Sequence, residues 1–371
     1  MTQEETARGA LSGLKVIDLT RVLAGPFCTQ ILADHGADVL KVESPEGDET
    51  RRWGPPFVGD ASAYFMNVNR NKRGIILNLR EQEGRDALTG LLEGADVLVE
   101  NFKPGTLDKW GFGRNALEQR YPRLVHCCIS GFGETGPYGG MPGYDAAIQA
   151  MSGLMSINGE PDGPPLRIGA PVVDMVTGLN AAIGILMALH ERSSSGKGQY
   201  VDAALFDGAL SILHPYSANF LYTGKIPERT GSAHPNITPY DTFATGDGPI
   251  FLAVGSDQQF RKLCEMIARP DLAKDERFTS NASRTRHRAA LKRELEAALA
   301  AFRVEPLAEE LIRAGVPCAP VLNLQQALYH PQAKHRNMVW EEGEYRGVGN
   351  PIRLSRTPAR FRRPPPELGE G

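Results

Sequence analysis

The amino-terminal third of the chain alternates short apolar runs with stretches of helical spacing. Between the runs, apolar residues recur every three or four positions, as in AGPFCTQILADHGA and EQEGRDALTGLLEGA. Strands joined by helical crossovers predict a parallel, doubly wound, Rossmann-like α/β sheet. The apolar runs expected to form its strands are Leu14–Thr20, Asp38–Glu43, Gly74–Leu79, Asp96–Asn101 and Leu124–Gly131.

The opening strand–helix–strand unit resembles a dinucleotide-binding unit, including an acidic residue, Glu43, at the end of its second strand. The loop after the first strand, TRVLAGPF, holds one glycine where the G-x-G-x-x-G fingerprint needs three. This argues against a nicotinamide-dependent dehydrogenase. The crevice at the carboxyl ends of the strands remains the expected ligand site. The segments expected around it are Arg21–Gly25, the loop after Glu43, Asn78–Arg80 and Asn101–Gly105.

Between Ser130 and Gly169 the chain is rich in glycine and proline, as in GFGETGPYGGMPGYD and NGEPDGPP. Such segments either form tight loops that bring backbone close to a ligand or serve as flexible surface loops. The composition leaves both interpretations open.

Beyond Tyr222 the residue composition changes, and a linker rich in turn residues leads to an expected strand, Pro249–Ser256. Three helical segments follow: DQQFRKLCEMIA, SRTRHRAALKRELEAALAAF and EPLAEELIRAG. We therefore predict a smaller α+β domain over residues 225–314 and a large domain over residues 1–222 and 315–371. The segments VPCAPVLN and PIRLSRTP are expected to be strands that return to the large domain.

Asp174 is the only charged residue between Arg167 and Glu191. A buried, unpaired carboxylate is costly and usually has a raised pKa. Pro171 suits the first position of a helix, which would place Asp174 at the end of the first turn, where the helix dipole favours an anion. A dehydrated carboxylate kept ionised in this way has the character of a nucleophile. The alternative is a structural aspartate satisfied by backbone N–H groups.

The apolar segment that follows Asp174 spans about fifteen residues, which is too short to cross a bilayer. It is expected to be a buried core helix. The net charge of −3 gives no electrostatic reason to expect nucleic acid or an anionic membrane as a partner. Hydrophobic residues make up 41% of the chain and charged residues 23%, as in a globular protein of one large or two ordinary domains.

The five cysteines form no CxxC pair, which predicts reduced core thiols and no metal site. The polar amino terminus, MTQEETARGALSG, lacks an apolar segment typical of a signal peptide, so a cytoplasmic location is expected. Small basic clusters, Arg51–Arg52 and Arg70–Arg73, suit a phosphorylated small molecule.

A series of motifs follows in a specific order along the chain: LKVIDLTRVLAGP, GADVLKVE, YFMNVNRNKRGIILNL, DVLVENFKPGTLDKWGFG, GPY…GYDAA…SGLM and APVVDMVTG. Taken together, they resemble the class III coenzyme A transferases, the CaiB/BaiF family. The resemblance extends from about Leu14 to Leu368, and the stretches GDETRRWGPPFVG and GSAHPNITPYDTF are most similar to succinyl-CoA:glutarate-type members.

The resemblance implies that Asp174 is the catalytic nucleophile and that coenzyme A is a substrate rather than a permanently bound cofactor. It also implies an interlocked homodimer of two ring-like subunits, with no metal. The coenzyme A contacts that it implies are Leu23, Ala24, Leu77, Asn78, Arg80, Asn101, Phe102, Lys103, Lys109, Tyr144 and Asp145.

The chain departs from the formyl-CoA transferases at two points. Ser44 stands where those enzymes carry an arginine, so the phosphate contact would pass to another basic residue. Their glycine-rich active-site loop has no counterpart here, which argues against formate or oxalate as the preferred acids.

The implied reaction moves coenzyme A from an acyl-CoA, with succinyl-CoA the expected donor, to a small dicarboxylic acid through an acyl-aspartyl anhydride and an aspartyl-CoA thioester. Arginine is the natural bidentate partner of the second carboxylate, and Arg21, Arg51 and Arg52 are the candidates.

Two alternatives are an α-methylacyl-CoA racemase and a non-catalytic CoA-binding protein. The racemases of this superfamily carry a histidine where this chain has Tyr144, and a tyrosine is a poor base near neutrality. His126 lies in an apolar run and is expected to be a packed core histidine.

Overall fold

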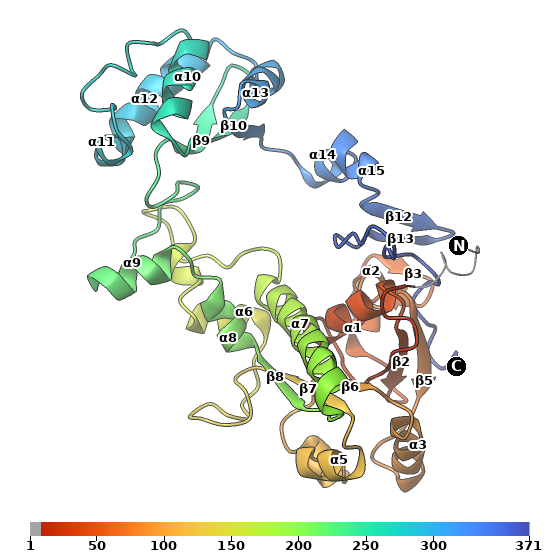
Figure 1. Ribbon diagram of the computed structural model, residues 1–371. Coiled ribbons are helices and arrows are strands. Elements are labelled where there is room, and N and C mark those ends of the chain that lie inside the picture. Colours follow the sequence, from red (N-terminus) through yellow and green to blue (C-terminus); the bar gives the residue numbers. More distant parts are fainter. Residues whose placement is uncertain (1–8, 371) are drawn as a thin grey trace. The chain divides into compact units, whose positions relative to one another are not determined.

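A computed structural model describes residues 9–370 (Figure 1). The segment MTQEETARGALSG, for which no signal peptide is expected, lies mostly outside the described residues. A parallel sheet of six strands is the centre of the larger part, in the order β5-β2-β1-β6-β7-β8. This confirms the predicted doubly wound α/β sheet. The strands are β1 (Lys15–Asp18), β2 (Asp38–Glu43), β5 (Lys72–Ile76), β6 (Val97–Glu100), β7 (Val125–Ser130) and β8 (Tyr200–Ala204).

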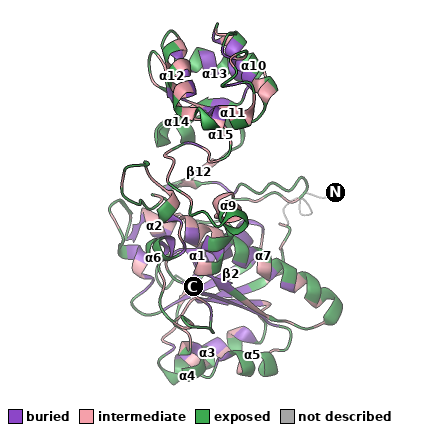
Figure 2. Ribbon diagram, turned by 90° about the vertical axis from the view of Figure 1, so that its left-hand side faces the viewer, coloured by how far each residue is buried: buried purple, intermediate pink, exposed green. Residues whose placement is uncertain are grey.

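Helices cover both faces of this sheet. On one face, α3 (Gln82–Leu92), α4 (Thr106–Lys109) and α5 (Arg114–Arg120) supply Leu88, Leu92, Leu107 and Leu117 to a core shared with alternate strand residues such as Leu40 and Leu98. On the other face, α1 (Ala24–Asp34) and the long α7 (Val172–Ser195) pack together and against the strands. The central strands β2, β6 and β7 are accordingly largely buried, and the edge strands β5 and β8 are partly exposed (β2 is labelled in Figure 2).

Helices α1 and α7 approach each other at the level of their backbones. A Cβ atom added to Gly178 would lie 2.6 Å from the carbonyl oxygen of Ala24 and 3.1 Å from the Phe27 ring. Gly178 is one turn beyond Asp174, and Ala24 is the first residue of α1. The contact therefore fixes the start of α1 relative to the first turn of α7.

We expect Gly178→Ala to lower the free energy of unfolding by about 1–3 kcal/mol, because the added methyl group meets backbone that cannot move aside cheaply. Chemical denaturation measures this. Gly90→Ala is the matched control, since Gly90 lies in α3 with nothing within 4 Å of an added Cβ. That control should be neutral or stabilise by about 1 kcal/mol. Equal stability of the two variants would contradict the close approach.

One face of α7 is exposed, so the prediction of a buried core helix is wrong for that face. Leu179, Ile183 and Met187 are 38%, 49% and 67% exposed, while Ala181 and Ile185 on the opposite side are buried. The helix has 24 residues and is the one helix within residues 9–370 that is long and apolar enough to span a membrane, judged by length and composition alone. The shorter segment expected from the sequence underestimated it, because the helix continues through polar residues to Ser195.

The larger unit runs to Leu154 and continues as Arg167–Leu213 and from His330 onward. Cys28, Cys127 and Cys128 are buried here, and all five cysteines of the chain are buried free thiols, as predicted. Its remaining elements are η2 (Glu49–Arg52), β3 (Phe57–Val58), β4 (Ala61–Ser62), α2 (Ala63–Met66), α6 (Asp145–Met151), α8 (Leu205–Ser211), α15 (Pro331–His335), β12 (Val339–Glu342) and β13 (Tyr345–Val348).

The second unit comprises Met155–Leu166 and His214–Tyr329, with its own core around Phe260, Leu295 and Leu311. These boundaries differ from the predicted ones, and the division into a domain of residues 1–222 with 315–371 and a domain of residues 225–314 stays a prediction. Its elements are η3 (Met155–Ile157), α9 (Tyr216–Thr223), β9 (Tyr240–Ala244), β10 (Pro249–Ala253), α10 (Asp257–Met266), α11 (Asn281–Arg286), α12 (Arg288–Leu299), α13 (Val304–Arg313), β11 (Cys318–Pro320) and α14 (Leu324–Leu328).

Two expected strands behave differently from the prediction. VPCAPVLN contributes β11, which pairs antiparallel with β10 inside the second unit rather than returning to the large sheet. PIRLSRTP forms no strand. Both segments are short and rich in proline, which lacks the N–H needed for a sheet ladder.

Candidate active site

A cavity of about 290 Å³ lies in the larger unit at the carboxyl ends of β1, β6 and β7. Strand β1 lies between β2 and β6, so the chain reverses its direction of winding there, and ligands of doubly wound folds bind at such a point. The loops after these strands form most of its wall. The lining residues are Arg21–Ala24, Glu49, Asn101–Pro104, Ile129–Gly131, Met141–Tyr144, Asp174 and Leu205.

Asp174 is the third residue of α7 and contributes a half-buried carboxylate to this cavity. Burial raises the pKa of this carboxyl to about 7, and the nearby Asp145 carboxylate adds to the rise. The predicted position at the end of the first helical turn is confirmed. The expectation was an ionised carboxylate; with a pKa of about 7, Asp174 is instead partly protonated at neutral pH.

Asp145 explains why the helix dipole does not lower this pKa. One of its carboxylate oxygens, Oδ1, accepts hydrogen bonds from the backbone N–H groups of Val173 (2.8 Å) and Asp174 (3.2 Å). The other accepts from the Gln149 side chain at 2.7 Å. Asp145 is buried and caps α7 in place of Pro171, which has no side-chain cap. The positive end of α7 is therefore satisfied by Asp145, and Asp174 faces a negative neighbour.

Tyr64 also lies near these carboxylates. Burial and, to a smaller extent, the charges of Asp174, Asp145 and Asp48 together raise the pKa of its phenol to about 12. Its ring packs edge-on against Trp53, with ring centroids 5.4 Å apart. A phenol kept neutral at this place is a hydrogen-bond donor beside the acidic centre.

The loop after β1 presents a cation to the cavity. Arg21 is exposed and its guanidinium lies 5.9 Å from the centre of the Phe102 ring. The Asn101 side chain accepts from the Arg21 N–H (2.9 Å) and donates to the Arg21 carbonyl (2.7 Å). Lys103 adds a second exposed cation to the lining. The mouth of the cavity thus carries positive charge suited to anionic ligands.

The structure brings together part of the predicted coenzyme A contacts. Leu23, Ala24, Asn101, Phe102, Lys103 and Tyr144 line the cavity. Asp145 lies behind it as the cap of α7.

The other predicted contacts are not among the lining residues. Leu77, Asn78 and Arg80 follow β5, where the Asn78 side chain donates to Glu81 (2.7 Å) and accepts from the Arg80 N–H (3.2 Å). Lys109 is exposed at the end of α4. For these residues the coenzyme A contact stays a prediction.

Of the two other candidate carboxylate anchors, Arg51 is engaged internally. Its guanidinium donates to both carboxylate oxygens of Glu43 (2.8 and 2.6 Å) and to the carbonyl of Pro366 (3.0 Å). This corrects its assignment as a substrate anchor. Glu43, which ends β2 as the ribose-binding acid of a dinucleotide site would, is likewise occupied. Arg52 is exposed and does not line the cavity.

The other basic cluster is used in the same way. Arg70 pairs with Asp34 at 2.7 Å and Lys72 with Asp18 at 3.0 Å, and all four side chains are buried. Arg73 pairs with Asp38 on the surface. Arg70 and Lys72 are thus buried and paired inside the protein, and Arg73 is paired with an acid on the surface, so the cluster does not form a free basic site.

Val22 and Glu49 line the cavity and belong to segments expected around it, Arg21–Gly25 and the loop after Glu43, although neither was singled out as a site residue. Tyr64 lies near Asp174 without any sequence signal. The glycine- and proline-rich segment did give one, since Gly131 and Met141–Tyr144 bring backbone to the cavity. Within residues 9–370, no cluster of three or more His, Cys, Asp or Glu side chains could hold a metal ion.

The model of the family described as CoA-transferase family III matches residues 11–371. The chain belongs to CoA-transferase family III. The Acetobacter aceti acetyl-CoA:oxalate CoA-transferase is 43% identical, over 96% of this chain and 92% of that protein. The Agrobacterium fabrum succinate–glutarate CoA-transferase is 42% identical, over 100% and 96%. The human succinyl-CoA:glutarate CoA-transferase is 38% identical, over 97% and 84%.

Solved structures agree with this CoA-transferase assignment. A CaiB/BaiF family protein from Brucella suis has a TM-score of 0.88 and 45% identity, and the match covers 98% of this chain and 97% of that one. The expectation that oxalate is disfavoured finds no support among the relatives, since the oxalate transferase is as similar as the glutarate transferase. The named relatives use different acids, so they do not decide which acids this CoA-transferase uses.

Proposed function

We propose that the protein transfers coenzyme A from an acyl-CoA, with succinyl-CoA as the leading donor, to a small dicarboxylic acid. The proposal rests on the position of Asp174 in the cavity. Its half-buried carboxylate faces a cavity at the switch point of the sheet, with Arg21 and Lys103 in the same lining. The names of the succinate–glutarate and succinyl-CoA:glutarate relatives support these substrates.

In the proposed reaction, a carboxylate oxygen of Asp174 attacks the thioester carbonyl carbon of the donor. The C–S bond breaks, coenzyme A leaves as the thiolate, and an acyl-aspartyl anhydride remains. The thiolate then attacks the aspartyl carbonyl carbon, which releases the donor acid as a carboxylate and leaves an aspartyl-CoA thioester. The acceptor carboxylate attacks this thioester, and the thiolate leaves again. Its final attack on the acceptor carbonyl gives the new acyl-CoA and restores the Asp174 carboxylate.

The surroundings of Asp174 suit this sequence. Burial that raises its pKa to about 7 also keeps the oxygen poorly solvated, which makes the ionised fraction more nucleophilic. The anhydride is sensitive to hydrolysis, so a site with limited water favours transfer over loss. The neutral Tyr64 phenol near the same carboxylate is a candidate donor to the oxyanion that forms at each attack.

Arg21 is the proposed anchor of the second carboxylate, because its exposed guanidinium belongs to the cavity lining and lies over the Phe102 ring, away from the hydrogen bonds that hold its backbone. For the phosphates of coenzyme A, the loop after β2 offers substitutes for the contact missing at Ser44. Hydrogen bonds from Ser44 and the backbone lower the pKa of Glu46, and so do the charges of Arg80 and Arg52. Both arginines therefore lie near this loop and are exposed.

A homodimer is part of the same proposal. The exposed apolar face of α7, with Leu179, Ile183 and Met187, is of the kind that an interface between copies covers.

The α-methylacyl-CoA racemase alternative gains nothing from the geometry. Tyr144 is 61% exposed, and His126 is buried in β7 with its ring against Tyr200.

The deciding experiment offers succinyl-CoA, and in parallel acetyl-CoA, with a panel of carboxylic acids and detects new CoA esters by mass spectrometry. We expect products with C4–C6 dicarboxylates, and a covalent adduct on Asp174 that hydroxylamine removes. Oxalyl-CoA formed from acetyl-CoA as the main product would instead favour the activity named for the Acetobacter relative. Absence of any exchanged ester, together with exchange of α-deuterium from 2-methylacyl-CoA, would overturn the proposal in favour of a racemase.

A further inference from the structure

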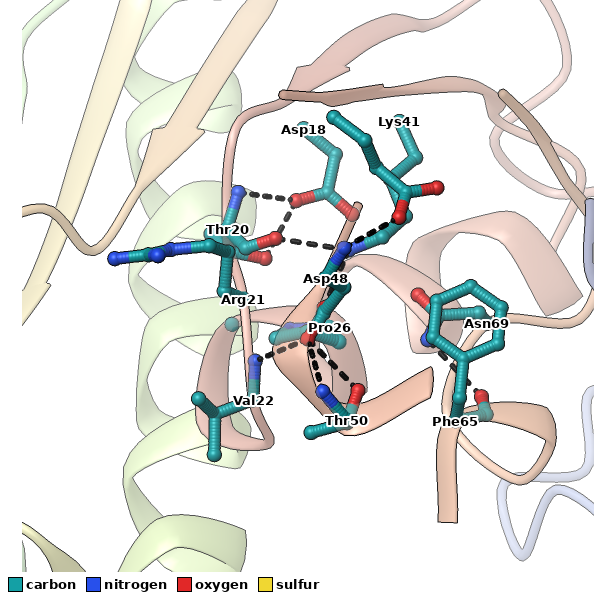
Figure 3. A network of polar contacts seen from close by, with 12 residues as sticks. Asp18, Thr20, Arg21, Val22, Pro26, Lys41, Asp48, Thr50, Phe65 and Asn69 are labelled. Carbon is teal, nitrogen blue, oxygen red and sulfur yellow. Dashed lines mark hydrogen bonds and ion pairs between the residues drawn. The ribbon is translucent and has the colours of Figure 1, made fainter. Parts of the chain in front are cut away.

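A network of buried charges lies directly behind the loop that follows β1 (Figure 3). Lys41 of β2 and Asp48, the residue before η2, form an ion pair of 3.0 Å in which both side chains are completely buried. Burial raises the pKa of the Asp48 carboxyl, but Lys41 and the hydrogen bonds from Thr50 outweigh it, so the net pKa lies below its usual value. The pair is therefore ionised in the interior of the unit.

The ion pair holds the loop on both sides of Arg21. The Lys41 ammonium donates to the carbonyl oxygen of Thr20 at 2.8 Å. The Asp48 carboxylate accepts from the backbone N–H of Val22 at 3.4 Å, through the same oxygen that accepts from Thr50. On the opposite side, Asn101 contacts both polar backbone groups of Arg21. Each peptide of this segment thus has a fixed partner.

The loop needs such a hold because Val22 is in an unfavourable conformation. Its φ angle is +70°, in the left-handed region that a β-branched residue rarely adopts. Backbone in this region persists where the surroundings determine it, and such positions gather at functional sites. Without the contacts to Lys41 and Asp48, we expect the φ angle of Val22 to relax to a negative value.

The position of the loop matters for Asp174. Arg21, Val22 and Ala24 line the cavity together with Asp174. The loop continues into α1, whose first carbonyl lies against Gly178 of α7, one turn beyond Asp174. A shift of the loop therefore changes the wall that faces the carboxylate.

Stability alone does not account for this ion pair. The desolvation of two buried charges offsets their attraction, and apolar residues of the same volume often serve as well. Two directed hydrogen bonds to backbone at defined positions are what an apolar pair would not provide.

We propose that Lys41 and Asp48 are positioning residues for the transfer reaction: they hold the Thr20–Ala24 loop in its strained conformation opposite Asp174. This rests on the proposed function for its catalytic consequence, but not for its structural one. Neither residue touches substrate in this scheme, and both act through Val22 and Thr20.

The first test compares Asp48→Asn with Asp34→Asn. Asp34 is the matched control, because it forms an equally buried ion pair with Arg70 at the far end of α1 and does not contact the loop. Asp48→Asn keeps an oxygen that can accept from Val22, but it places an NH2 group where Oδ2 meets the Lys41 ammonium and so breaks the ion pair. We expect it to lower kcat by about 10²-fold, as misplacement of a reacting group by about 1 Å does, with the KM for acyl-CoA nearly unchanged. Asp34→Asn should keep kcat within about threefold of the wild-type value, even if its melting temperature falls by as much as that of Asp48→Asn. Equal losses of kcat in the two variants would overturn the proposal.

The second test uses the strain itself. Glycine adopts a positive φ without penalty, so Val22→Gly should lessen the need for the hold. We expect the double variant Val22→Gly/Asp48→Asn to recover at least about tenfold in kcat over Asp48→Asn alone, which a simple loss of packing would not allow. A double variant as slow as Asp48→Asn, or slower, would count against the role of the strain.

A third measurement separates this proposal from the proposed function. Amide hydrogen exchange reports the loop directly, whatever reaction the protein performs. The Arg21 and Val22 amides should exchange faster in Asp48→Asn than in wild type, and unchanged in Asp34→Asn. If wild type transfers no acyl group, the proposed function fails, and the exchange rates alone decide the positioning role. Unaltered exchange in folded Asp48→Asn would overturn that role even if transfer is confirmed.

Discussion

Replacing Asp174 by alanine is expected to lower kcat for CoA transfer by at least about 10⁴-fold, since covalent catalysis has no substitute once its nucleophile is gone. Asp174→Asn should lose as much, because the carboxamide has nearly the same shape but no anionic oxygen. Binding of acyl-CoA should persist in both variants, as the cavity walls from the loops after β1 and β6 remain. Steady-state kinetics and calorimetric titration with acyl-CoA measure the two quantities separately.

Folding is a useful control for these variants, and its pH dependence has a definite sign. The pKa of Asp174 is about 7 in the folded protein against 3.8 for the ordinary group, so the folded state holds the proton more tightly. Stability contributed by this group therefore falls as the pH rises from about 4 to about 7. Above pH 7, Asp174→Asn should be at least as stable as wild type, so a loss of activity there cannot be ascribed to unfolding.

Two results would contradict the covalent scheme. One is turnover of Asp174→Ala within tenfold of wild type. The other is an intact-mass spectrum of wild type during turnover that has neither an acyl nor a CoA adduct on Asp174. Either would leave a CoA-transferase that brings its two substrates together directly, in a single ternary complex.

The sequence located the sheet and the centre of the site because both leave local signals. The strand β2, Asp38–Glu43, matches its predicted bounds residue for residue, because the apolar residues Val39, Leu40 and Val42 mark a buried strand even though Lys41 interrupts them. Asp174 stood out as a lone charge in an apolar segment, and Pro171 placed it correctly in the first turn of α7. These features depend on neighbours in sequence, which is why they could be predicted.

What the sequence could not give depends on partners far apart along the chain. Arg51 was a reasonable candidate anchor until its bidentate pairing with Glu43 and its bond to Pro366 became visible. The cap of α7 comes from Asp145, 29 residues before Asp174, and its charge adds to the burial that raises the pKa of the nucleophile. The exposure of one face of α7 could not be predicted either, because an apolar composition does not distinguish a core helix from an uncovered one.

Asp145 therefore gives the second large effect, which a pH profile will detect. In wild type, kcat/KM should rise with pH through a midpoint near 7, because only the ionised Asp174 carboxylate attacks. Asp145→Asn removes a negative charge that raises the pKa of Asp174, so its midpoint should fall below 7, towards the ordinary value of an aspartate. The asparagine oxygen can still accept from the Val173 and Asp174 N–H groups, so this variant isolates the charge.

Asp145→Ala removes the cap as well as the charge. We expect the same shift of the midpoint and, in addition, a loss of kcat of about 10²-fold on the alkaline plateau, because the first turn of α7 no longer fixes the Asp174 carboxylate. Glu118→Gln is the control, as it removes one exposed negative charge on α5 and should leave the profile unchanged. A midpoint that stays near 7 in Asp145→Asn would mean that burial alone sets the pKa of Asp174. A plateau that is equal in the asparagine and alanine variants would mean that the cap contributes nothing to the aim of the nucleophile.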